Sequence, residues 1–172
     1  MASDRSIVAE DLYRLRFVGD PRVSPDGRWV AFVVTTLDEA QNEYRSRIWL
    51  VPGDGGAAAR PLTGGVGKDT SPRWSPDGRR LAFVSDRAVA VRPEGAEEGE
   101  ATKPQLWVLD LAGGEARQVT AVKRGAGDPA WSPDGRQLAF TSQTGGDDEA
   151  ADAALAGKPA DERTKVGPSG SR

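Results

Sequence analysis

Three aspartates are the first candidates for a chemical role, because a carboxylate recurs at the same position in three similar segments. Each follows Ser-Pro and precedes Gly, and they are Asp26, Asp77 and Asp134. Carboxylates brought together could bind a metal ion, but a calcium loop needs several acids at alternate positions and a distal Glu, which this sequence lacks. Pro before and Gly after each Asp are the residues of a tight turn. We therefore expect the three aspartates to shape turns and not to bind metal.

Two of the residue types most often used in catalysis are missing. The 172-residue sequence has no His and no Cys, which excludes a Ser-His-Asp triad, a disulfide framework and a thiolate metal site. Ser169, in "GPSGS", lacks the strand-to-helix setting of the nucleophile elbow G-x-S-x-G. We therefore predict no catalytic, cofactor-binding or metal-binding residue in this chain, and no cofactor.

Charge and motif patterns exclude several other classes of partner. The net charge is -3 with acids and bases mixed, so no basic stripe indicates nucleic-acid binding. "LTGGVGKDT", around Lys68, lacks the spacing of a phosphate loop. An acidic run could meet a cationic partner but is more often a hydrated loop; its members are Glu94, Glu97, Glu98 and Glu100. The mixed-charge residues 1–17 and the absence of a stretch of about 20 apolar residues predict a cytoplasmic protein without a membrane partner.

Three copies of one hairpin must position the aspartate turns. "PRVSPDGRWVAFVV" starts at Pro21, "PRWSPDGRRLAFVSD" at Pro72 and "PAWSPDGRQLAFTS" at Pro129, at offsets of 51 and 57 residues. Each reads as strand, turn and strand. The second strand, as in residues 81–84, is apolar on both faces, so we expect it to be covered on both sides.

Two copies continue into two more short strands. "RIWLVP" and "ARPLT" follow the first hairpin, and "QLWVLDL" and "ARQVT" follow the second. Four antiparallel strands in about 50 residues are typical of a propeller blade. Trp74 matches Trp131, and Trp49 matches Trp107, which favours packing between blades over an aromatic binding platform.

The predicted fold class is all-β, a partial β-propeller of two four-stranded antiparallel blades plus the first hairpin of a third. A short helix is expected within residues 4–17, with Ser6 as its N-cap. The predicted segments are an N-terminal segment 1–20, blade one 21–66, blade two 67–123, the start of blade three 124–142, and a flexible loop or disordered tail 143–172. Closure takes about 4 to 8 blades, so we expect the N-terminal portion of a longer protein.

The repeats carry a resemblance to a known family. "EDLYRLRFVGDPRVSPDGRWVAFVV" from Glu10, with "WSPDGRRLAFVSDR" and "LWVLDLAGGEARQVT", is similar to the opening of bacterial peptidases of the prolyl oligopeptidase family, in their acylaminoacyl- or dipeptidyl-peptidase-like branch. The resemblance implies a propeller that caps an α/β-hydrolase domain and admits short peptides as a filter and lid. The family's triad matches no position here, so the implied partners are a C-terminal hydrolase domain, the remaining blades and a peptide substrate.

Two other propeller classes share parts of this pattern. A non-enzymatic interaction scaffold of the Tol-system type carries the same Asp-Gly repeats and is the alternative function. A Trp-Asp repeat propeller is disfavoured because the sequence has neither a Trp-Asp dipeptide nor a Gly-His pair. A downstream reading frame with G-x-S-x-G, then Asp and His, would distinguish a peptidase from a scaffold.

Overall fold

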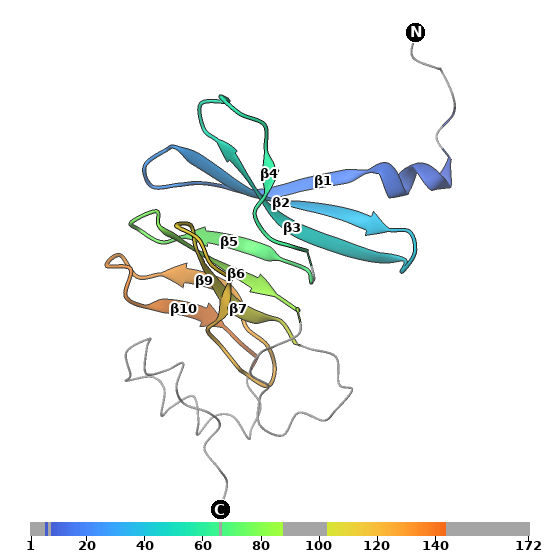
Figure 1. Ribbon diagram of the computed structural model, residues 1–172. Coiled ribbons are helices and arrows are strands. Elements are labelled where there is room, and N and C mark those ends of the chain that lie inside the picture. The colour runs from blue at the N-terminus through green and yellow to red at the C-terminus, as the bar shows by residue number, and fades with distance from the viewer. Residues whose placement is uncertain (1–5, 7, 66, 88–102, 144–172) are drawn as a thin grey trace, which may run out of the picture.

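The computed structural model describes residues 6, 8–65, 67–87 and 103–143, and these residues form three separate antiparallel sheets. Figure 1 shows the sheets following one another as successive layers and not as one continuous sheet. Each sheet is built from one copy of the repeat. The predicted partial β-propeller is therefore confirmed, and we call the sheets blades 1, 2 and 3.

Blades 1 and 2 repeat one four-stranded meander. Blade 1 contains β1 (Arg16–Val23), β2 (Trp29–Asp38), β3 (Glu43–Pro52) and β4 (Arg60–Pro61), in that spatial order. Blade 2 contains β5 (Thr70–Trp74), β6 (Arg80–Ser85), β7 (Gln105–Asp110) and β8 (Arg117–Gln118), again in chain order. Blade 3 is described only as the hairpin of β9 (Gly127–Trp131) and β10 (Leu138–Thr141).

Blade 2 buries both of its faces, as the apolar pattern of its central strands predicts. Alternate residues of β6 and β7 belong to two different core clusters because successive side chains of a strand point to opposite faces. The cluster shared with blade 1 contains Ala31, Ile48, Leu50, Leu81, Phe83, Trp107 and Leu109. The cluster toward blade 3 contains Ala82, Val84, Leu106, Val108, Val119 and Ala126, with Trp131 and Leu138 packed against it.

The first strand of each blade bends at the residue before its proline. Asp20, Ser71 and Asp128 have positive φ angles of 46°, 53° and 45°. In β1 and β5 the pairing register shifts across this residue, which is the signature of a bulge. A left-handed backbone is uncommon for residues other than Gly, so its threefold recurrence shows that the repeat extends to backbone conformation.

The N-terminal helix lies within the predicted residues 4–17 but starts later than its predicted N-cap. It is a 3₁₀ helix, η1 (Ala9–Arg14), and its N-cap is Val8, so the prediction of Ser6 is wrong. The Asp11 side chain determines this start, because its Oδ2 accepts a hydrogen bond from the Val8 N–H at 3.0 Å while the Asp11 N–H donates to the Val8 carbonyl. The apolar side chains of Leu12 and Leu15 are exposed and lie outside both core clusters.

Several predicted features lie outside the described residues. They are the acidic run, Ser169, and the tail from residue 144 onward.

Candidate functional site

The three aspartates form the same hydrogen-bonded turn in each blade. Their Oδ1 atoms accept hydrogen bonds from the hydroxyls of Ser24, Ser75 and Ser132 at 2.6, 2.5 and 2.5 Å. The same oxygens accept from the backbone N–H groups of Arg28, Arg79 and Arg136 at 3.0, 3.1 and 3.0 Å. Gly78, with a φ of 68°, supplies the left-handed residue that such a turn needs. The geometry is that of a turn, and none of the described residues forms a group of three or more potential metal ligands.

These contacts favour the ionised aspartates. A hydrogen bond from the Ser24 hydroxyl, and then one from the Arg28 backbone N–H, lower the pKa of Asp26 below its ordinary value of 3.8. The serine hydroxyl is also the largest cause of the lowered pKa of Asp77 and of Asp134. We therefore expect the repeated turns to be sensitive to acid.

Acidification should weaken the fold through these three turns. Because the folded-state pKa values are lowered, the ionised carboxylates stabilise the fold fully above the ordinary pKa, and this stabilisation is lost as the pH falls below it. The triple variant Asp26→Asn, Asp77→Asn, Asp134→Asn should be less stable than the parent at about pH 5, and the difference should shrink at about pH 3. Urea midpoints at the two pH values measure this. A constant difference would contradict the titration of these groups.

A buried ion pair lies at the opposite end of blade 2 from its aspartate turn. Arg87 Nη2 lies 2.7 Å from Asp69 Oδ1, and the two side chains are 19% and 0% exposed. The Arg87 guanidinium also lies over the rings of Phe83 and Trp107, at 5.2 and 5.0 Å from their centroids. A Cβ at Gly67 would meet the backbone nitrogen of Arg87 at 2.6 Å, so this connector needs glycine.

Sequence reasoning missed this ion pair. Asp69 precedes β5, Arg87 follows β6, and 18 positions separate them. The sequence carried only a weak signal, which was a charged residue just before β5 and another just after β6. Charged residues at the ends of strands are common. The neighbouring Lys68 forms no phosphate loop, because its backbone N–H donates to Asp86 Oδ1 and a strand follows instead of a helix.

Tryptophans join successive blades by a repeated hydrogen bond. The indole N–H of Trp74 donates to the Arg22 carbonyl at 2.8 Å, and that of Trp131 donates to the Arg73 carbonyl at 3.0 Å. Arg22 and Arg73 occupy the same position of the repeat. Arg73 also forms an ion pair with Asp20 of blade 1 at 2.8 Å. The predicted packing between blades is confirmed for Trp74, Trp107 and Trp131, whereas Trp49 belongs to neither core cluster of the described residues.

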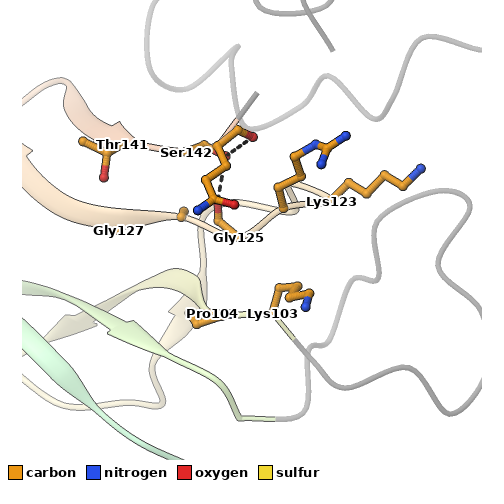
Figure 2. Close-up of a pocket in the computed structure, with 10 residues that line it drawn as sticks. Lys103, Pro104, Lys123, Gly125, Gly127, Thr141 and Ser142 are labelled. Atoms are coloured by element: carbon orange, nitrogen blue, oxygen red, sulfur yellow. Dashed lines mark hydrogen bonds between the residues drawn. The ribbon is translucent and has the colours of Figure 1, made fainter. Parts of the chain in front are cut away.

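A hollow of about 640 Å³ opens at the end of the strands away from the aspartate turns. Its described lining comes from three segments: Lys103 and Pro104 before β7, residues 123–127 between β8 and β9, and residues 141–143 at the end of β10. Figure 2 shows Lys103 and Pro104 on one side of the hollow and Gly125 and Ser142 on the other.

Hydrogen bonds hold the three segments of the hollow together. The Ser142 hydroxyl donates to the Gly125 carbonyl at 2.7 Å, and the Ala126 N–H donates to the Pro104 carbonyl at 2.8 Å (Figure 2 draws the first). Lys103, Lys123 and Arg124 are cationic, and the described lining contains no acid. The Thr141 hydroxyl of the lining donates a hydrogen bond to Asp128 Oδ2 at 3.0 Å, so a carboxylate also borders the hollow.

Comparison with known proteins relates this chain to peptidases. No family model matches it. The uncharacterized peptidase YuxL of Bacillus subtilis is 39% identical over 139 residues, which cover 81% of this chain and 19% of that protein. The acylaminoacyl peptidase of Pyrococcus horikoshii is 25% identical with a TM-score of 0.57, over 76% of this chain and 18% of that one. The β-propeller domain of the trilobed protease from Pyrococcus furiosus is 26% identical with a TM-score of 0.55, over 74% of this chain and 34% of that domain.

The chain is homologous to part of a peptidase propeller. This propeller portion spans about a fifth of the length of the Bacillus peptidase and about a third of the Pyrococcus furiosus propeller domain. The three blades of the propeller portion thus correspond to an arc of a larger ring. Within its described residues, the propeller portion contains no helix with the length and apolarity needed to cross a membrane.

Proposed function

We propose that this chain is an N-terminal fragment of the propeller of a serine peptidase of the prolyl oligopeptidase family, which hydrolyses short peptides. The propeller excludes long or folded chains and admits short ones, and the chain itself is not catalytic. The observation that carries the proposal is the 39% identity to a peptidase over 81% of this chain. The proposal includes a separate α/β-hydrolase domain that supplies the Ser, Asp and His, and the cytoplasmic location expected from the sequence.

The packing of the blades suits a filter. Blade 2 is covered by apolar layers on both faces, and indole hydrogen bonds join it to blade 1 and blade 3. Close-packed interiors resist deformation, so the stacked blades form a rigid structure. The loops of this rigid structure would then determine which peptides pass. The lack of any His supports the non-catalytic role, because no serine here has the usual base to activate it.

Hydrolysis should require polypeptide beyond this chain. We expect the purified 172-residue chain to cleave neither acylaminoacyl nor dipeptidyl chromogenic substrates. The product of the extended reading frame should cleave one of these substrates and should react with a fluorophosphonate probe.

In the extended product, kcat/KM should fall as peptides lengthen, and removal of the propeller should abolish this length dependence.

Two results would contradict the proposal. One is a reading frame that adds further repeats but no G-x-S-x-G, which would favour the interaction scaffold. The other is turnover by the 172-residue chain that persists through further purification.

A further inference from the structure

We propose that the outer face of blade 1 binds a further blade of the same propeller, through that blade's layer of alanine and aliphatic side chains. The outer face is the side of blade 1 that points away from blade 2, and its residues are Val18, Val23, Val30, Phe32, Trp49 and Val51. The inference rests on the proposed function, because it requires a longer propeller, and it names the surface that receives the rest of that propeller.

Strand pairing places these side chains on one face of the sheet. Val23 pairs with Val30, and Phe32 pairs with Trp49. Ala31 lies between Val30 and Phe32 and belongs to the core shared with blade 2, so its two neighbours point the other way. Figure 1 shows blade 2 against one face of blade 1 and, among the described strands, no sheet against the opposite face.

The equivalent face of blade 2 is buried. The repeat aligns Phe32 with Phe83 and Trp49 with Trp107. Phe83 and Trp107 are 0% and 6% exposed, because they pack against blade 1. Phe32 and Trp49 remain partly exposed, and no described sheet precedes blade 1. The outer face of blade 1 is therefore a surface of the kind that joins two blades, without the blade that would cover it.

The two described joints show what kind of surface covers such a face. At each joint the later blade contributes aromatic and leucine side chains, and the earlier blade contributes an alanine and two aliphatic side chains. The aliphatic set of blade 1 is Ala31, Ile48 and Leu50. The set at the same repeat positions of blade 2 is Ala82, Leu106 and Val108. Because the outer face of blade 1 carries Phe and Trp, its complement is the aliphatic set of a blade that precedes it in the ring.

The occupant is a whole blade from later in the chain. Blade 1 has four strands in chain order, as blade 2 does, so no strand is missing from it. In a closed ring of about 4 to 8 blades, the blade that precedes blade 1 in space is the last blade along the chain. This chain covers 34% of the related Pyrococcus furiosus propeller domain, which leaves room for such a blade. Val23 stands where Trp74 and Trp131 donate their indole hydrogen bonds, so this joint would rest on apolar contacts.

Cysteine accessibility tests the inference, because the 172-residue chain has no native Cys. Val18→Cys and Val23→Cys are introduced separately into this chain and into the product of the extended reading frame, and maleimide labelling of each site is followed by peptide mass spectrometry. The two valines are 66% and 63% exposed, so labelling of the 172-residue chain should be fast. Labelling of the extended product should be slower by about tenfold or more, because a covering blade excludes the reagent.

The matched control is Phe17→Cys. Phe17 adjoins Val18 and is 52% exposed, but it pairs with Thr35 on the face toward blade 2. Its labelling rate should differ by less than about twofold between the two proteins, since a blade on the outer face does not reach it.

Four results would overturn the inference. They are unchanged labelling of both valine variants in the extended product, equal slowing of Phe17→Cys, a reading frame that adds no further blade, and slow labelling of the 172-residue chain that becomes fast on dilution. The last of these would assign the outer face to a second copy of the chain. The peptidase proposal depends instead on hydrolysis by the extended product, so the two proposals can fail independently.

Discussion

Replacing Arg87 by Met should lower the free energy of unfolding by about 3 kcal/mol. The Arg87 guanidinium lies over the rings of Phe83 and Trp107, and the flexible apolar side chain of Met can contact the same rings, so the loss comes mainly from the charge. It leaves the Asp69 carboxylate fully buried without its cation, and Asp69 Oδ2 already has no hydrogen-bond partner among the described residues. Urea unfolding followed by tryptophan fluorescence measures the loss.

Two variants test whether burial causes this effect. Arg45→Met breaks an ion pair with Asp38 whose side chains are 27% and 33% exposed, and it should cost less than about 1 kcal/mol. Asp69→Leu combined with Arg87→Met removes both charges and should be more stable than Arg87→Met alone, because no unpaired carboxylate remains. Equal losses for Arg87→Met and Arg45→Met would show that burial of the pair is not what stabilises blade 2.

Replacing Trp74 by Ala should cost about 3 kcal/mol, at the low end for a core Trp because the side chain is only half-buried. The substitution removes a ring packed against the core between blades 1 and 2 together with the hydrogen bond to the Arg22 carbonyl. Trp74→Phe keeps most of the ring and should cost about 1 kcal/mol, which is typical of one lost hydrogen bond. Urea midpoints and amide exchange of β1 and β5 measure both variants.

The first repeat offers a matched control for Trp74. Val23 occupies the same position in blade 1 and is 63% exposed, with no preceding blade in this chain. Val23→Ala should therefore change stability by less than about 0.5 kcal/mol. A loss as large as that of Trp74→Ala would mean that the repeat position itself, and not the contact between blades, carries the energy.

Local chemistry made the fold predictable from the sequence. The Ser-Pro-Asp-Gly turns, the strands between them and the repeat of about 50 residues are local features, and each appears where it was expected. The prediction that Ser6 is the N-cap was wrong because of another local interaction. The Asp11 carboxylate accepts a hydrogen bond from the Val8 N–H, and the helix starts after Val8.

The sequence by itself determined that blades form, that both faces of blade 2 are covered, and that no His or Cys chemistry is available. Tertiary structure alone decided that Asp69 meets Arg87, that Trp74 bonds to a carbonyl 52 residues earlier, and that three segments distant in sequence line one hollow. Turn and strand preferences depend on neighbouring residues, whereas Asp69 meets Arg87 through the pairing of β5 with β6 within one sheet. The indole N–H of Trp74 meets a carbonyl of blade 1 only because the two blades stack on each other.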